Sequence, residues 1–226
     1  SEKIEQYTIT EAVTYVNERG TNLPTIISPF LEKAIQQICE TERIERWDEF
    51  WGYFSETIVR QTCEALYNAW STMSWDKARH LLADRMYSVN NGWIEFYRNN
   101  KFINKLDDFQ VRSIILAKIS TDLYYQAITV RIFASCFDYV IDERGKMVGG
   151  SRKKRRDFSE YWTFVRRVDA SKKAAEYNDI STCPACGSPA DKISDTAQCG
   201  YCGSKISSAS FSWVLALIIQ DEAYEG

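Results

Sequence analysis

Several features that are common in enzymes and membrane proteins are scarce in this sequence. Its 226 residues include one histidine, His80, and four prolines. The longest uninterrupted apolar run extends over seven residues, from Trp213 to Ile219, whereas a membrane-spanning helix needs about 20. The formal charge of −3 provides no overall attraction to nucleic acid or to an anionic membrane. Any electrostatic binding must therefore depend on a local cluster of charge.

Motifs that carry catalytic chemistry are also missing from the sequence. It contains no phosphate-cradling glycine loop, no G-x-S-x-G string and no H-E-x-x-H string. A single histidine without a serine or cysteine partner at a recognisable spacing does not make a catalytic triad. Three acids, Asp122, Asp138 and Asp142, stand near the predicted strands, but acids at strand ends and turns are usually solvated. We therefore predict that the protein has no catalytic residues and is not an enzyme.

Cysteine, by contrast, is well represented and is arranged for metal binding. Cys183 and Cys186 form one C-x-x-C pair, Cys199 and Cys202 form a second, and twelve residues separate the two pairs. Four thiolates at this spacing suit a closed tetrahedral zinc site with no open position for water. We predict a zinc ribbon that holds one structural Zn²⁺. Two disulfides are the alternative in an oxidising compartment, and iron can occupy a similar site.

Three further cysteines, Cys39, Cys63 and Cys136, lie within apolar patterns. Buried thiols without a redox role are the ordinary reason for such positions. Together with the zinc site they favour a reducing compartment. We predict a cytoplasmic protein, or one that lies peripherally at a membrane surface.

The first part of the chain shows the apolar spacing of helices. Residues 28–47 carry apolar positions about four apart, with Ser28 as the N-cap and Pro29 at the first helical position. A stripe of aromatic and aliphatic residues then recurs every three to four positions over 47–70. This period predicts one long amphipathic helix, whose stripe is more often core than a binding surface.

Two shorter helices are expected before the pattern changes. Ser74 is suited to cap the first of them. The string Asn90-Asn91-Gly92 is a turn signal, so we expect it to end that helix and to precede a short one over 93–97. This second helix should end near residues 99–100.

Beyond residue 110 the sequence acquires the alternation of β-strands. Isoleucine, valine and aromatic residues dominate, and buried and exposed types alternate over 128–136. The first two stretches turn near 120–123, and a further turn, which contains glycine, follows at 142–145. The expected strands are 111–119, 124–141, 158–168 and 211–219, the last lying on the ribbon or on the main sheet. Helices followed by antiparallel strands predict an α+β fold in which the helices cover one face of a sheet.

The order of these elements resembles a known family. The helical stretch Trp47–Tyr67, the long strands within 125–141 and the string Trp162-Thr-Phe-Val-Arg166 preceded by Glu160 are similar to the C-terminal domain family of subunit 44 of the mitochondrial inner-membrane protein translocase. That family also includes a mitochondrial ribosomal large-subunit protein and many bacterial proteins. The resemblance covers about residues 50–167, and bacterial relatives carry a similar ribbon.

This resemblance implies a fold and a role. The fold is of the nuclear-transport-factor or cystatin type, in which helices close a curved antiparallel sheet into a cone with an apolar pocket. In the translocase subunit the domain is associated with the membrane surface and acidic lipid and serves as a scaffold. The resemblance supplies no catalytic residues.

From these observations we predict a non-catalytic binding or scaffold protein with an apolar pocket or groove for a peptide, a protein or a lipid. The residues expected to contact this ligand are aromatic: Trp51, Phe54, Trp70, Trp93 and Trp162. A basic run is the strongest local charge and consists of Arg152, Lys153, Lys154, Arg155 and Arg156. It can bind an anionic lipid surface or, as an alternative function, RNA or a ribosome. A solvated turn that protects a sheet edge is the more ordinary explanation for such a run.

The chain then divides into four parts. They are a helical N-terminal arm (1–46), a cone-shaped α+β domain (47–172), a zinc ribbon (173–209) and an apolar tail strand (210–226).

Overall fold

The computed structural model describes residues 22–168, 200–201 and 213–226. The four cysteines of the predicted zinc ribbon, Cys183, Cys186, Cys199 and Cys202, lie outside this described part, so the ribbon stays a prediction. The helical segments are α2 (Leu31–Glu42), α3 (Trp47–Tyr53), the π-helix η2 (Phe54–Arg60), α4 (Gln61–Ser71), the 3₁₀ helix η3 (Trp75–Leu81), α5 (Asp84–Asn99) and the 3₁₀ turn η6 (Asp221–Ala223). The strands are β1 (Phe102–Thr121), β2 (Tyr125–Asp142), β3 (Met147–Gly150), β4 (Arg156–Arg167) and β5 (Val214–Gln220).

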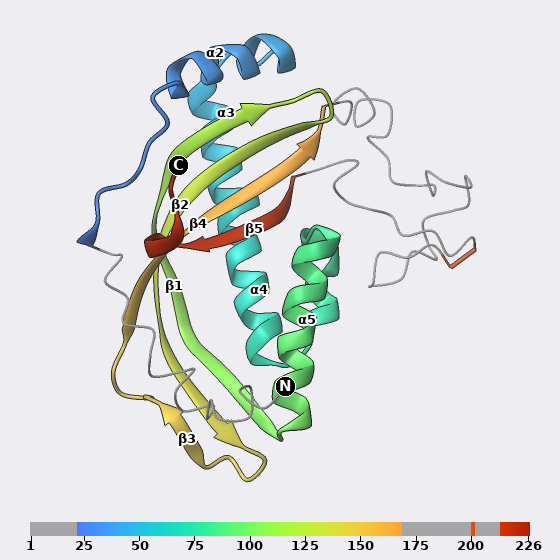
Figure 1. Ribbon diagram of the computed structural model, residues 1–226, viewed down its shortest axis with the longest axis vertical. Coiled ribbons are helices and arrows are strands. Elements are labelled where there is room, and N and C mark those ends of the chain that lie inside the picture. Colours follow the sequence, from blue (N-terminus) through green and yellow to red (C-terminus); the bar gives the residue numbers. More distant parts are fainter. Residues whose placement is uncertain (1–21, 169–199, 202–212) are drawn as a thin grey trace.

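The strands form one antiparallel sheet in the order β1-β2-β4-β5, and β3 pairs with the far end of β2. Figure 1 shows the sheet curving around α4, with α5 beside it. We call the face that packs on α3, η2 and α4 the inner face and the opposite one the outer face. Ile128, Val130 and Ile132 of β2 are buried on the inner face, where the ring of Phe164 of β4 meets the ring of Phe54 edge-on, with 5.7 Å between the ring centroids. The predicted α+β fold with helices on one sheet face is confirmed.

The helix predicted over 47–70 is continuous but is not uniform. Its central seven residues, Phe54–Arg60, form a π-helix between α3 and α4. A π-helix has more residues per turn than an α-helix, so the side chains of α4 point in different directions from those that a continuous α-helix would give them. Phe54 is fully buried, and its ring also meets Trp213 edge-on at 5.3 Å. The aromatic stripe of this helix therefore contributes to the core.

The helix predicted over 28–47 is shorter than expected at both ends. It begins at Leu31, after Pro29, and the Ser28 hydroxyl accepts a hydrogen bond from the backbone of Phe30 rather than capping the helix interior. It ends at Glu42 because Arg43 adopts a left-handed conformation, with φ of 55°. The backbone N–H of Ile44 then donates to the carbonyl of Cys39, which closes the helix end.

One prediction about the next helices is confirmed in part and another is wrong. Ser74 occupies the N-cap position of η3, as predicted, but its hydroxyl makes no capping bond and donates instead to the carbonyl of Thr72. The string at 90–92 does not turn, since α5 continues through it to Asn99. Burial of Ile94 and Tyr97 against the core extends the helix, and tertiary packing of this kind overrides local turn preference. The predicted end near 99–100 is confirmed.

The predicted strands are confirmed, with two additions. β1 begins at Phe102, nine residues earlier than expected. A bulge between Asp107 and Gln110 interrupts the alternation of buried and exposed residues, so the sequence pattern does not reveal the first part of this strand. β3 was not expected, since it consists of Met-Val-Gly-Gly. The last strand, β5, pairs with β4, so its place is on the main sheet.

Candidate binding surface

The five aromatic residues predicted to bind a ligand do not converge on one place. Phe54 and Trp162 are buried in the core, with at most 2% of their surface exposed. Trp51 stacks on Trp47 and Phe54 at the margin of the core. The indole N–H of Trp70 donates to Asn104 Oδ1 at 2.8 Å. These four residues lie in or beside the core, whereas Trp93 is half exposed on α5.

The inner face carries one buried acid that the sequence did not reveal. Glu160 of β4 is 8% exposed and accepts hydrogen bonds from the Trp162 indole N–H at 2.9 Å and from Gln220 Nε2 at 2.8 Å. Burial raises the pKa of Glu160, and these two hydrogen bonds oppose the rise. Its burial depends on β5, which lies 60 residues away in sequence, so no local signal could have found it.

The basic run is largely occupied by contacts within the protein. Arg155 pairs with Asp108 and also donates to Ser135 Oγ at 3.1 Å. Arg156 pairs with Asp138, and the Arg152 guanidinium lies over the ring of Tyr139. These contacts fasten the loop to β1 and β2. Lys153 and Lys154 are exposed, and anionic binding by the run stays a prediction.

The three acids considered for catalysis have structural roles. Asp122 Oδ1 accepts from the backbone N–H groups of Tyr124 and Tyr125, each at 2.7 Å, and these bonds lower its pKa. Asp142 accepts in the same way from Arg144 and Lys146 in the β2–β3 turn. Asp138 accepts from Asn104 and Arg156. Each carboxylate stabilises a turn or joins neighbouring strands.

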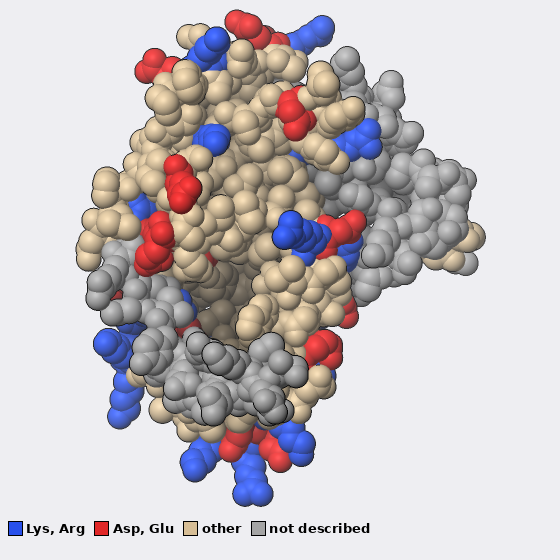
Figure 2. All heavy atoms as spheres, viewed as in Figure 1, with Lys and Arg blue, Asp and Glu red and all other residues tan. Residues whose placement is uncertain are grey.

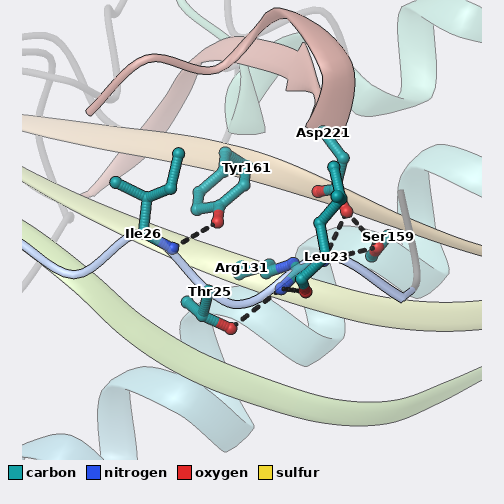
Figure 3. A network of polar contacts seen from close by, with 7 residues as sticks. All are labelled: Leu23, Thr25, Ile26, Arg131, Ser159, Tyr161 and Asp221. Carbon is teal, nitrogen blue, oxygen red and sulfur yellow. Dashed lines mark hydrogen bonds and ion pairs between the residues drawn. The ribbon is translucent and has the colours of Figure 1, made fainter. Parts of the chain in front are cut away.

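Part of the outer face is closed by the two ends of the described chain. Arg131 of β2 is 1% exposed and donates to Leu23 O at 2.8 Å, Thr25 Oγ1 at 3.0 Å and Asp221 Oδ2 at 2.5 Å (Figure 3). Ser159 also donates to Asp221 Oδ2. One arginine therefore fastens both the segment 22–28 and the C-terminal tail to the sheet.

Tyr161 of the neighbouring strand β4 also holds both ends of the described chain against the outer face. The Tyr161 hydroxyl accepts a hydrogen bond from the backbone of Ile26 at 2.8 Å (Figure 3), and its ring stacks on Tyr224 at 3.7 Å. Arg131 and Tyr161 are directly opposite each other in the β2–β4 register. The closure thus covers one band across the outer face.

The described residues leave the outer face open at the end where β1 turns into β2. Leu123 and Tyr124 are the most exposed large apolar residues there, at 87% and 70%, and we call Leu123, Tyr124 and Tyr125 the hairpin tip. Beside it lies a hollow of about 390 Å³ with a mainly apolar lining. The lining residues of this hairpin hollow are Ser120, Thr121, Asp122, Tyr125, Ala127 and Val165. Over this half of the sheet the surface in Figure 2 is mostly uncharged, with isolated acidic and basic side chains.

Sequence reasoning did not find this open end. The exposed apolar residues of the hairpin tip occupy a turn, and their neighbours Ala127 and Val165 meet only through the pairing of β2 with β4. The available signal was that Leu123, at the end of the expected turn near 120–123, is followed at once by Tyr124 and Tyr125, which places three large apolar residues in a row beside a turn.

The remaining candidate groups show no metal site within the described ranges. No cluster of three or more histidine, cysteine or acidic residues forms among the described residues. Cys63 and Cys136 are buried as predicted, while Cys39 is half-buried. Burial raises the pKa of the Cys63 thiol well above its usual value, which keeps it protonated. In the described part of the chain, no helix combines the length and apolar character needed to span a bilayer.

Comparison with known proteins agrees with the fold. A family model described as the Tim44-like domain matches residues 52–175, more than half of the chain. A solved structure, the intermembrane-space region of the chloroplast protein ARC6, has 9% identity and a TM-score of 0.35 over 49% of this chain and 82% of that chain. A likeness at that score adds nothing to the family match, and no curated protein matches. The family match, on an α+β fold with helices against one face of a curved sheet, confirms the resemblance: the chain belongs to the Tim44-like domain family.

Proposed function

We propose that this protein is a non-catalytic binding or scaffold protein that attaches peripherally to an anionic membrane surface through the hairpin tip. The observation that carries the proposal is the exposure of Leu123 and Tyr124 at the open end of the sheet. Leucine and tyrosine suit the boundary between water and lipid, where an apolar body enters the bilayer and a hydroxyl stays in water. Membership of the Tim44-like family supports a scaffold role.

The backbone of the hairpin tip is held in place before any ligand binds. Asp122 accepts from the N–H groups of Tyr124 and Tyr125, and the N–H of Val168 donates to the carbonyl of Tyr124 at 2.8 Å. A loop that is already ordered loses little conformational freedom on binding. The hairpin tip therefore presents its apolar side chains without first having to fold.

Basic residues accompany the hairpin tip. Arg167 is directly opposite Tyr125 in the register of β2 and β4, and Lys118 lies three residues before Thr121, where β1 ends. Each lysine or arginine near an anionic surface contributes about 1 kcal/mol of attraction. The hairpin hollow next to them has room for an apolar side chain or part of an acyl chain.

The test measures sedimentation of the full chain with vesicles of phosphatidylcholine, with and without phosphatidylglycerol. We expect binding to the anionic vesicles, and a loss of about tenfold or more in the partition coefficient for the double variant Leu123→Ser/Tyr124→Ser, because apolar area no longer enters the bilayer. Met147→Ser is the control, since Met147 is 45% exposed and lies in β3 at the other end of β2. Equal binding by the double variant, or no binding by the unaltered chain, would contradict the proposal.

We also propose that Cys183, Cys186, Cys199 and Cys202 bind one structural zinc ion. Support comes from the spacing of the two C-x-x-C pairs, which suits tetrahedral thiolate ligation. Metal binding to such a site contributes directly to local folding.

Replacing Cys183 and Cys199 with serine should remove about one equivalent of zinc per chain, as measured by atomic emission on purified protein. Cys39→Ser is the control, because Cys39 lies in α2, outside the two pairs. Thiol titration of the unfolded chain distinguishes the alternative, since two disulfides would leave these four cysteines unreactive. Retention of the full zinc content by the double variant would contradict the assignment of these cysteines as zinc ligands.

A further inference from the structure

The helix α5 is apolar on two faces. Ile94 and Tyr97 are buried against the core, yet Val89, Trp93 and Phe96 are 54%, 53% and 40% exposed. Spacings of four and three residues place these three side chains along one stripe of the helix. A surface helix that only covers a core needs a single apolar face. The described residues therefore leave the exposed stripe of α5, defined by Val89, Trp93 and Phe96, open to a partner.

A glycine in the middle of this stripe has no role within the described chain. Gly92 lies inside α5, where glycine is less favourable than alanine. A Cβ added at Gly92 would meet nothing within 4 Å, and its φ is not positive. Neither close packing nor backbone conformation in the described part of the structure requires glycine at this position. A second helix that packs closely against α5 would require glycine here, because the absence of a side chain at Gly92 leaves room for a large side chain of that second helix.

We propose that two copies of this chain associate through antiparallel packing of their α5 helices. With the two-fold axis between residues 92 and 93, Gly92 of one copy faces Trp93 of the other, and Val89 faces Phe96. Each contact then joins a small side chain to a large one, and the same surface serves both copies, as a two-fold interface requires. The stripe is thus complementary to itself when one copy is reversed.

Charges at the two ends of α5 fit the same register. Asp84 begins the helix and pairs with Arg79, yet its side chain is 80% exposed; Lys101 follows the helix and pairs with Glu143, yet its side chain is 71% exposed. In the antiparallel arrangement Asp84 of one copy faces Lys101 of the other, and Arg85 faces Asn100, so like charges do not meet there. Antiparallel helices also bring opposite ends of their dipoles together. Figure 2 shows charged side chains where α5 begins and a mostly uncharged surface along the helix beyond them.

The first experiment measures the dissociation constant of the full chain by sedimentation equilibrium. We expect Gly92→Ala to raise this constant about tenfold or more, because a methyl group enters the space for Trp93. The control is Gly52→Ala in α3, where an added Cβ also meets nothing within 4 Å. Both variants should raise the urea midpoint of the separated chains, since alanine favours helix. Only Gly92→Ala should weaken association. A variant that stabilises the separated chain and yet weakens the dimer identifies an interface position, because a purely structural position would not change the dissociation constant.

The second experiment identifies the register. A zero-length carbodiimide cross-link is sought between Asp84 and Lys101 in a mixture of ¹⁴N and ¹⁵N chains. Seventeen residues of helix separate these groups by about 25 Å in one copy, so the link can form only between copies. We expect the mixed-isotope cross-linked peptide in the unaltered chain and its loss in Trp93→Lys, whose exposed position tolerates lysine.

Two results would overturn the proposal. One is a monomer at all concentrations measured, in which case the stripe serves a different partner. The other is an oligomer whose dissociation constant is the same in Gly92→Ala and Gly52→Ala, or that lacks the 84–101 cross-link.

Discussion

Replacing Arg131 with methionine is expected to lower the free energy of unfolding by about 3–5 kcal/mol. Arg131 and Asp221 form an ion pair whose side chains are 1% and 2% exposed. Removing the guanidinium leaves the Asp221 carboxylate buried without its cation, and the carbonyl of Leu23 and hydroxyl of Thr25 without their donor. Chemical unfolding in urea measures the loss. Hydrogen exchange should show the greatest loss of protection in 22–28 and 221–226, because these segments depend on the same side chain.

A surface ion pair provides the matched control for this change. Arg112 pairs with Asp157 at 2.8 Å, and both side chains are about half exposed, so Arg112→Met should cost about 1 kcal/mol or less. The double variant Arg131→Met/Asp221→Leu should recover much of the stability lost by the single variant, because no buried charge remains. A single Arg131→Met variant as stable as Arg112→Met would show that the closure of the outer face does not depend on this arginine.

Gly150→Ala is expected to destabilise the fold by about 3 kcal/mol or more. Gly150 ends β3 with φ of +73°, and an added Cβ would overlap the carbonyl oxygen of Asp138 and lie 2.5 Å from Cα of Tyr139. These atoms are backbone atoms of β2, so they cannot move aside without disturbing the sheet. The strain acts on the connection to the basic run, since the N–H of Ser151 donates to the same Asp138 carbonyl at 2.9 Å.

A glycine in the neighbouring turn distinguishes the two causes of the expected loss of stability, which are the left-handed backbone conformation and the overlap with the backbone of β2. Gly145 has a similar φ of +76°, but a Cβ there would meet nothing within 4 Å. Gly145→Ala should therefore show only the cost of the left-handed conformation, about 1–2 kcal/mol. Urea unfolding of both variants checks the comparison. Equal losses would mean that backbone conformation, not the close approach to β2, makes glycine necessary at position 150.

The candidate binding surface at the hairpin tip differs from the aromatic surface that the sequence predicted, and the difference has a physical reason. The aromatic residues Trp51, Phe54 and Trp162 looked suited to a ligand because of their chemistry, but that chemistry also makes them the best core residues. The structure places Phe54 and Trp162 in the core and leaves the hairpin tip exposed. Composition alone does not distinguish an aromatic residue that packs on its own chain from one that awaits a partner.

The basic run shows the same limitation for charge. Counting Arg152 to Arg156 suggests a strong local field, yet Arg155 and Arg156 each pair with an acid from a distant strand. Asp108 and Asp138 are brought beside them by the β1–β2–β4 order. A net charge read along the sequence therefore overstates the charge that remains for a partner.

The sequence by itself determined the features that follow from local periodicity. The three-to-four-residue spacing over 47–70 predicted the long helix, and the alternation over 128–136 predicted β2, because each pattern reflects the geometry of a single element. The order of helices and strands then indicated the α+β fold and the family. The spacing of the four cysteines carries the zinc prediction in the same local way.

Only the tertiary structure decided what depends on contacts between distant residues. It extended α5 through 90–92 because Ile94 and Tyr97 pack on the core, and it buried Glu160 beside Gln220. It also joined Arg131 to Leu23 and Asp221, which lie about a hundred residues away on either side. These pairings follow from strand order and packing, which no window of the sequence contains, and they determine which apolar surface is closed and which stays open.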